Sequence, residues 1–396
     1  MRSKLFTSTL IITSIIIVNL YQCKKSENIL PLTKSWEKAI PHQEIPEGLT
    51  SISAKSCGVC HLKHYNEWKL STHAHAWTDL QFQSELKKES SPFMCINCHI
   101  PLQNQQEYIV SGLIDGDIYK PVKTINPHFD KDLQLEGITC ASCHVRNKAI
   151  IGPTGSTKAP HKTIKDTVLL SEQLCISCHN ATAVLTPTLA CTFETGDEWK
   201  AGPFFGKKNC ISCHMDTVSR ELAAGFGIKL SHQHYFAGSG IPKFDSIESK
   251  IKNGLAIYPT TLKKMYRSGD SVHFNLKVKN EFAGHKVPTG DPERFFNISF
   301  SIKDESGTIR SSKEYRIGEV WEWYPEAKKI SDNNLLPGEE RTFRFSYHAL
   351  QKEKLYLTVE VTKHRLNKES AEYNKLGKNY PLYITVFQKE YMTEVY

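Results

Sequence analysis

Five copies of the pattern Cys-x-x-Cys-His dominate this chain of 396 residues and account for ten of its 12 cysteines. Residue frequencies would give about 0.02 copies by chance, so the pattern has a chemical cause. Two cysteines three positions apart lie on one face of a helical turn, where both thiols can bond one haem and the next histidine can ligate its iron. We therefore predict five covalently attached haems c, with the histidines as proximal ligands. The copies are Cys57-Cys60-His61, Cys95-Cys98-His99, Cys140-Cys143-His144, Cys175-Cys178-His179 and Cys210-Cys213-His214.

Zinc and disulfide bonds are the competing explanations for cysteines at this spacing. A structural zinc site needs four ligands, so the units would have to pair, and five units leave one unpaired. Zinc also gives no reason for a histidine directly after every second cysteine. Disulfide frameworks are typical of small secreted domains, which are much shorter than this chain. Cys191 lies outside the five copies and is interpreted as a buried apolar thiol, with a labile ligand or an intermolecular disulfide as alternatives.

The N-terminus has the composition of an export signal. Arg2 and Lys4 precede a mostly apolar run over 5–20, which is shorter than the roughly 20 residues of a membrane-spanning helix. Cys23 follows and resembles the acylated cysteine of a bacterial lipoprotein, although Gln22 stands where a small residue is usual. We expect a signal peptide over 1–22, lipidation of Cys23 and a tether over 23–50; an uncleaved anchor and an unmodified Cys23 are the alternatives. Each places the haems outside the cytoplasmic membrane, in the periplasm or on the outer surface.

The charge of the chain gives no support for nucleic acid as a partner. The formal net charge is +8, but the ten propionates of five haems would offset most of it. No basic stripe with interleaved aromatic residues stands out in the sequence. The expected partners are redox proteins, together with the membrane through the lipid anchor.

Two regions of the chain differ in their sequence pattern. Residues 51–254 contain all five motifs and few long periodic segments, and 150–155 is typical of a loop, so we predict a cytochrome domain of mostly short α-helices and loops around the haems. Residues 255–396 lack cysteine and alternate between apolar and polar residues in 271–279, 295–302, 341–347, 355–362 and 382–388. Short strands between turns indicate an all-β, immunoglobulin-like sandwich over 255–396.

Several stretches around the motifs resemble multihaem cytochromes related to cytochrome c554 and hydroxylamine oxidoreductase. The resemblance covers roughly residues 55–300 and implies a second histidine ligand for each iron, taken from elsewhere in the chain. It assigns this distal role to His73, His161 and His234, with His75 and His232 as rivals two residues away. The stretches that carry it are Cys57–Ala76, Glu136–His144, Ala159–His161, His234–Gly238 and Gly284–Gly290, the last resembling a loop found where such cytochromes have a C-terminal β-domain.

Two of the five distal ligands remain unassigned. His64 lies three residues after His61 on the same predicted helix, so it cannot reach the opposite face of that haem, although it could serve a neighbouring one. Weaker candidates are His42, His128 and His285, and Met94 and Met215 are weaker still. His285 lies in a loop that could lean on the haem domain, although a simple turn is favoured. A haem without a protein sixth ligand is therefore an open alternative, and an open iron can bind small molecules.

Electron transfer is the function that these features favour. We expect a pentahaem cytochrome, exported and lipid-anchored, that relays single electrons between redox partners, with the β-domain as a docking or spacing module. The alternative is an enzyme that reduces or oxidises a nitrogen compound, such as nitrite, hydroxylamine or nitric oxide, at one five-coordinate haem. Against it, no Cys-x-x-Cys-Lys variant marks a catalytic haem. A surface protein that binds a partner through its β-domain is the third hypothesis.

Overall fold

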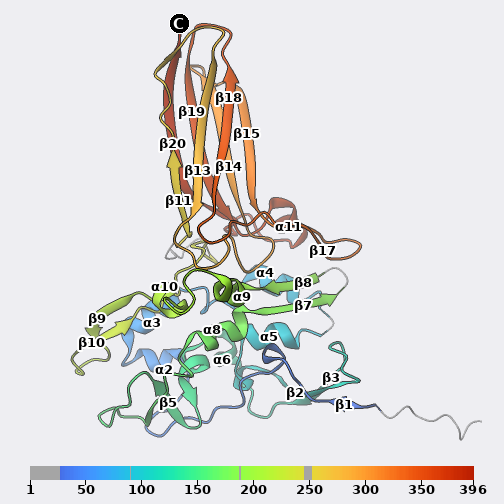
Figure 1. Ribbon diagram of the computed structural model, residues 1–396. Helices are drawn as coiled ribbons and strands as arrows, with labels where there is room; N and C mark the ends of the chain where they lie inside the picture. Colours follow the sequence, from blue (N-terminus) through green and yellow to red (C-terminus); the bar gives the residue numbers. More distant parts are fainter. Residues whose placement is uncertain (1–26, 90, 187–188, 245–251) are drawn as a thin grey trace, which may run out of the picture.

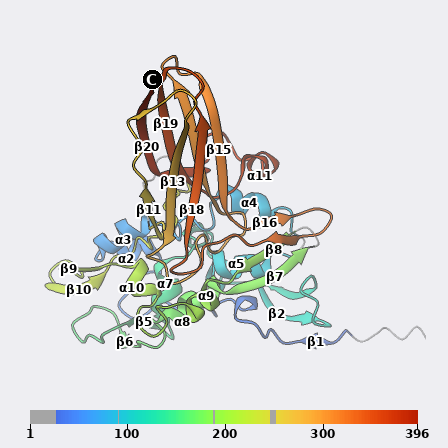
Figure 2. The ribbon, with the colours of Figure 1, turned by 45° about the horizontal axis from the view of Figure 1, so that its top comes forward.

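The computed structural model describes residues 27–89, 91–186, 189–244 and 252–396. The predicted signal peptide and Cys23 lie outside these residues. A haem-motif region of short helices and small sheets, up to residue 244, is followed by a β-region of long strands that stands on it (Figure 1). The C-terminus lies at the far end of the long strands in both views (Figures 1 and 2). None of the described helices is long and apolar enough to cross a membrane.

The haem-motif region consists of short elements, as predicted. Its apolar clusters are small, which fits an interior shaped for cofactors. Its helices are α2 (Ala54–Gly58), α3 (Leu62–Lys69), α4 (Leu80–Leu86), α5 (Phe93–His99), α6 (Lys131–Leu135), α7 (Cys140–His144), α8 (Glu172–His179), α9 (Thr195–Ala201) and α10 (Cys210–His214), with 3-10 turns η1 (Ser35–Glu37) and η2 (Gln103–Gln105). Its sheets join β1 (Ile29–Leu30), β2 (Tyr108–Ile114) and β3 (Pro121–Ile125); β4 (Val145–Arg146), β5 (Ala149–Gly152) and β6 (Thr163–Lys165); β7 (Ala181–Thr186) and β8 (Leu189–Phe193); and β9 (Thr217–Glu221) and β10 (Ile228–His232).

Two segments of this region differ from expectation. The predicted loop at 150–155 begins within β5, which pairs antiparallel with β4 and parallel with β6. The described part of the predicted tether, 27–50, packs on the haem-motif region: β1 pairs with β2, and Ile40 forms a bridge with Leu102. In both segments, pairing with a neighbouring strand satisfies backbone groups that would otherwise need water.

The β-region confirms the predicted strand content. The alternating segments fall on five of its strands, and all pairings are antiparallel except that of β12 with β20. One sheet has the order β11-β13-β18 and the other β12-β20-β19-β14-β15; the immunoglobulin-like type stays a prediction. The elements are β11 (Leu255–Pro259), β12 (Met265–Tyr266), β13 (Ser271–Asn280), β14 (Phe295–Asp304), β15 (Ile309–Gly318), β16 (Val320–Glu322), β17 (Lys328–Ser331), β18 (Glu340–His348), β19 (Glu353–His364), α11 (Lys368–Tyr373) and β20 (Tyr383–Val395).

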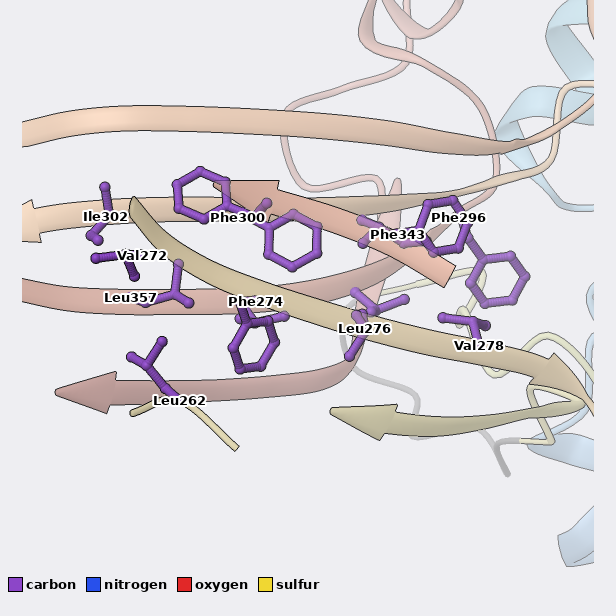
Figure 3. Packing of buried hydrophobic residues seen from close by; sticks show 14 of the residues in the cluster. Leu262, Val272, Phe274, Leu276, Val278, Phe296, Phe300, Ile302, Phe343 and Leu357 are labelled. Atoms are coloured by element: carbon purple, nitrogen blue, oxygen red, sulfur yellow. The ribbon is translucent and has the colours of Figure 1, made fainter. Parts of the chain in front are cut away.

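Alternation along the strands builds the core between the two sheets. Every second side chain of β13 and β14 is fully or almost fully buried, because successive side chains of a strand point to opposite faces. The ring of Phe300 contacts Phe274 from the other sheet at 6.2 Å and stacks on Phe345 at 5.7 Å. Figure 3 shows Phe300 and Phe274 within this cluster. The β-region therefore has a continuous apolar core that depends on no cofactor.

A buried polar network joins the two regions. Asp79, just before α4, accepts hydrogen bonds from the Tyr380 hydroxyl (2.7 Å) and from Lys243 Nζ (2.5 Å). Arg365, directly after β19, donates to the Tyr380 hydroxyl and to the carbonyls of residues 241 and 242. Because breaking hydrogen bonds between buried groups is costly, this network fixes how the β-region sits on the haem-motif region.

Replacing Phe300 with alanine tests the β-region core. We expect Phe300→Ala to lower the free energy of unfolding of this region by about 3–5 kcal/mol, because a fully buried ring is lost and a cavity remains. Phe282→Ala is the matched control, since the Phe282 side chain is 63% exposed, and should change stability by less than about 0.5 kcal/mol. Urea unfolding followed by circular dichroism measures both; equal effects would contradict the assigned core.

Candidate haem-binding site

The five motifs, numbered here as sites 1 to 5 in chain order, lie at the ends of short helices. In sites 2 to 5 the histidine is the last residue of α5, α7, α8 and α10. In site 1, α2 ends at Gly58, but the N–H of His61 still bonds to the Cys57 carbonyl (2.9 Å), so the helical turn continues. Each cysteine pair is thus held on one side of a turn, as attachment to a single haem requires.

Thiols of different motifs lie next to each other, which connects the five sites. Site 1 adjoins site 3, and site 4 adjoins both site 2 and site 5, because thiols of these motifs lie close enough to affect each other's pKa. Site 3 is also close to site 4, since the charge of Cys178 would affect the pKa of the Cys143 thiol. The neighbouring thiols are Cys57 with Cys140, Cys98 with Cys178, and Cys175 with Cys210.

The described His, Cys, Asp and Glu side chains do not gather in the way that a zinc site needs. Among the residues placed by the structure, no group of three or more of these side chains is arranged to hold a metal ion. A structural zinc site takes four protein ligands. The thiols are therefore not arranged for the competing zinc interpretation.

Four of the five motif histidines face a second histidine from elsewhere in the chain. The ring centres of the two partners lie 6.1–6.4 Å apart in every pair. The pairs are His61 with His161 (site 1), His144 with His234 (site 3), His179 with His73 (site 4) and His214 with His285 (site 5).

This separation is the one that haem ligation demands. Metal–imidazole bonds are about 2 Å long and the ring centre lies about 1 Å beyond the nitrogen, so two imidazoles on opposite sides of one iron have centres about 6 Å apart. Direct stacking of two rings is much closer, as the 3.6 Å between His99 and Phe82 shows. The separation of the facing histidines therefore fits a metal between them.

Hydrogen bonds hold most of these rings with one nitrogen free. The Nδ1 atoms of five of the eight paired rings, and that of His99, lie 2.5–3.0 Å from backbone carbonyl oxygens, which accept the ring N–H. Metal-ligating histidines are generally oriented in this way, and the remaining Nε2 lone pair is then available to a metal. The bonds are His61 to Leu222, His99 to Ala76, His144 to Ile151, His214 to Ala237, His234 to His232, and His285 to Lys286.

The rival histidines are placed differently. Nε2 of His75 bonds to the Lys69 carbonyl. Nε2 of His64 contacts the Ser231 hydroxyl, whereas its Nδ1 is buried without a hydrogen-bond partner among the described residues, and its ring lies 6.0 Å from His61 and 5.0 Å from His234. His42 and His128 contact each other at 4.5 Å. His232 directs Nδ1 at the Met215 carbonyl, and none of the described ring contacts joins it to a motif histidine.

Burial keeps the facing imidazoles neutral, as metal ligands must be. Loss of solvent lowers the pKa of His73 and His234 to about 3, and that of His179 and His285 to about 4. Burial also lowers the pKa of His161. An uncharged imidazole can offer a lone pair at any physiological pH.

His285 is the partner that sequence reasoning undervalued. Its loop is more than a turn, because Thr289 ties it to α9: the Thr289 hydroxyl donates to Glu198 Oε2 (2.6 Å) and contacts the Thr195 hydroxyl (2.8 Å). Gly202 allows the close approach, since a Cβ there would overlap the Gly284 carbonyl. The resemblance of 284–290 to a cytochrome loop was the available signal.

The stretch before site 3 positions two other sites. The Glu136 carboxylate accepts hydrogen bonds from the N–H of Ala54 (2.8 Å) and Lys55 (3.3 Å), and so caps the helix that carries Cys57. Gly137 has φ +61°, and a Cβ there would lie 2.7 Å from the His73 carbonyl, so glycine is needed beside this turn. Ile138 then donates its N–H to the same carbonyl (3.0 Å).

The stretch after β10 serves three sites. His234 belongs to the pair of site 3, and its N–H bonds to Glu67, which forms a buried ion pair with Arg220. Phe236, held at φ +48°, lies 4.4 Å from the His73 ring of site 4. The Ala237 carbonyl receives the His214 ring of site 5. The strained backbone at Phe236 is thus the bend that lets neighbouring residues reach different sites.

Site 2 differs from the other four. All 17 histidines of the chain lie in the described residues, and none of the ring contacts found there places a second imidazole opposite His99. Its ring stacks on Phe82 with an interplanar angle of 6°. Lys243 and Asp79 are the charged groups near enough to affect its pKa, which burial lowers to about 4.

Cys191 packs beside site 2. It contacts the apolar cluster of Phe93, Met94 and Leu113, and burial, followed by the nearby Cys95 thiol, raises the pKa of its thiol. These surroundings agree with the predicted apolar environment. Met94, a weak ligand candidate, is a buried member of the same cluster.

Comparisons with known proteins agree with this geometry. The family model of cytochrome c554 and c-prime matches residues 56–115. The fold is similar to that of a penta-heme cytochrome c552 from Thermochromatium tepidum, with 16% identity, a TM-score of 0.62, and coverage of 88% of this chain and 100% of that one. No curated protein matches the sequence.

Two further solved structures share only a little over a third of this chain. They are a β-glucosidase from Listeria innocua (13% identity, TM-score 0.20, 37% of this chain and 16% of that one) and the CARDB domain of the PF1109 protein from Pyrococcus furiosus (15% identity, TM-score 0.19, 36% and 87%). Scores this low carry no argument. The family match over 56–115, the fold and the five motifs all point the same way, and the chain is similar to multihaem c-type cytochromes.

Proposed function

We propose that this protein is an electron carrier that holds five haems c and passes single electrons between redox partners. The supporting observation is the set of four histidine pairs at 6.1–6.4 Å, each joining one motif to a distant residue. Haem iron, when bound, takes up and releases one electron. The five cysteine pairs attach the cofactors, and His61, His99, His144, His179 and His214 are the proximal ligands.

The distal ligands follow from the pairs. His161 serves site 1, His234 site 3 and His73 site 4, the three residues that the family resemblance implies. His285 serves site 5 and comes from the β-region. With ligands on both sides, these four sites suit electron transfer rather than binding of an external molecule.

Contacts between neighbouring sites provide the route for electrons through the protein. Sites 1, 3 and 4 form a series, and sites 2 and 5 both adjoin site 4 through neighbouring thiols. An electron entering at any site can therefore reach the others through adjacent cofactors. The chain contributes by orienting the motif histidines of sites 1, 2, 3 and 5 through backbone carbonyls, so that little rearrangement accompanies a change of charge.

We also propose that the protein is exported and anchored through a lipid on Cys23. The basic residues and the short apolar run over 1–20 support this, and so does the external location that haem c attachment requires. The partners are then redox proteins outside the cytoplasm, met through small transient contacts.

Replacing His285 with alanine tests the ligand assignment of site 5. The haem should stay attached, because both thioether bonds remain, but about one fifth of the haem should change from low-spin to high-spin. Acid-denatured protein should still carry about 3 kDa of bound cofactor, the mass of five haems. Electron paramagnetic resonance and mass spectrometry provide the two measurements.

His348→Ala is the matched control, since this exposed histidine lies in β18 of the same region and outside the pairs. His161→Ala should behave as His285→Ala does, at site 1. An unchanged spin state in His285→Ala would refute the assignment, and a mass without five haems would refute the proposed function itself.

The second candidate function is chemistry on a small nitrogen compound at site 2. The observation that favours it is the lack, among the described ring contacts, of an imidazole facing His99, while the other four motif histidines each have one. An iron with one protein ligand can bind an external molecule. The buried pair of Lys243 and Asp79 nearby supplies charged groups that could supply or accept a proton.

The ferric spectrum separates the two functions. If site 2 lacks a sixth ligand, about one fifth of the haem in the unmodified protein is high-spin, and nitrite, hydroxylamine or nitric oxide shifts its absorption. His99→Ala should change the spectrum of this high-spin fraction, because the iron of site 2 then loses its histidine ligand, whereas His75→Ala should leave it unchanged. Turnover of one of these compounds would favour the enzyme, and a fully low-spin spectrum would eliminate it.

A further inference from the structure

Lys363 is an exception among the buried charged residues of the chain. Buried charges are normally paired, because an isolated charge loses its hydration without compensation. Of the described cations with less than a tenth of their surface exposed, Arg220 pairs with Glu67 and Arg365 with Asp79. Lys363 is 7% exposed and has neither a hydrogen bond nor an ion pair from its side chain within the described part of the chain.

The position of Lys363 in the sheet makes its burial unusual. It lies across from Phe296 in the register of β14 and β19, and cross-strand partners share a face. The preceding residues on that face of β19 are Leu355, Leu357, Val359 and Val361, all fully buried. Lys363 thus occupies the next inward position of an apolar series, where its only described partner is the Phe296 ring at 5.3 Å.

A second cation lies close by. Arg294 lies directly before β14. Burial lowers the pKa of Lys363 most, and the nearby charge of Arg294 lowers it further. Its guanidinium donates a hydrogen bond to the Thr289 carbonyl (3.1 Å), and none of the described carboxylates forms an ion pair with it, although Asp291 is near enough to act on its pKa. Two like charges in a buried place repel each other, so this arrangement calls for an anion between or beside them.

The haem sites border these two cations. The charge of Lys363 acts on both His214 and His285, the pair of site 5. Arg294 acts on His179, the motif histidine of site 4. Each haem carries two propionate carboxylates, which are anions of the right chemistry and cannot diffuse away from a covalently attached cofactor. Lysine and arginine bind carboxylates by charge-assisted hydrogen bonds.

We propose that Lys363 binds a propionate of the site 5 haem, and that Arg294 assists by binding the propionates at the neighbouring edge of site 4. The β-region then gives site 5 two things, the distal ligand His285 and the counter-charge Lys363. This inference rests on the proposed attachment of haem at the five motifs. It assigns to the β-region control over the reduction potential of one haem, a role distinct from docking or spacing.

Lys363→Gln in the full, haem-loaded protein tests the proposal. Removing a cation from a propionate makes reduction of the adjacent iron less favourable, so the midpoint potential of one haem should fall. We expect roughly a tenfold change in its reduction equilibrium, equal to 59 mV for one electron. Spectroelectrochemical titration measures the potentials, and Lys363→Arg, which keeps the charge, should restore the original value.

Further variants show which haem undergoes the change in midpoint potential. Lys277→Gln in β13 removes a lysine whose ion pair with Glu340 is exposed, and should leave all potentials unchanged. In a His285→Ala background, the newly high-spin haem should be the one whose potential Lys363→Gln lowers. Arg294→Gln gives an independent test if Lys363→Gln fails to accumulate, with the fall expected at the haem of His73 and His179.

The possible outcomes separate the proposals. Five haems by mass, an intact β-region and unchanged potentials in Lys363→Gln would overturn this inference and leave the electron-transfer function standing. A mass without five haems would overturn the proposed function. A potential in the unmodified protein that changes with chloride or phosphate concentration would show that a diffusible anion, and not a propionate, neutralises Lys363.

Discussion

The separation of about 6 Å between facing imidazoles is the constraint on which the haem-motif region depends. Two imidazoles kept this far apart need other parts of the chain to hold each ring in place. Backbone carbonyls do this for the described motif histidines of sites 1, 2, 3 and 5. The helices can therefore be short, and the apolar clusters small, because the cofactors rather than side chains fill the interior.

Much of the site was predictable, because the attachment chemistry is local in sequence. A helical turn brings two thiols and a histidine together within five residues, and this was sufficient to predict all five attachment motifs. The facing histidines depend on contacts between distant parts of the chain, which no local period reveals. His73, His161 and His234 were predicted as distal ligands through the family resemblance, whereas His285 pairs with a residue 71 positions earlier and lies outside the region that carries the motifs.

In the β-region, strand positions were easier to predict than strand pairing. Five of its strands alternate regularly, so their positions followed from the sequence, while the other strands, the pairing of β12 with β20 and the sheet order depend on long-range contacts. The structure places Lys363 on the inward face after Val361, one residue beyond the alternating segment 355–362. The packing of 27–50 on β2 and η2 was not predictable, because composition alone does not distinguish a linker from a paired segment.

One turn of the chain serves two neighbouring sites. His73 faces the iron position of site 4, and the Ala76 carbonyl three residues later receives the ring N–H of His99 in site 2. A change of metal charge alters the strength of a ligand's hydrogen bond, so an electron gained at one centre acts on the other through a single piece of backbone. The two centres should then titrate together, with a curve that is not the sum of two independent Nernst curves.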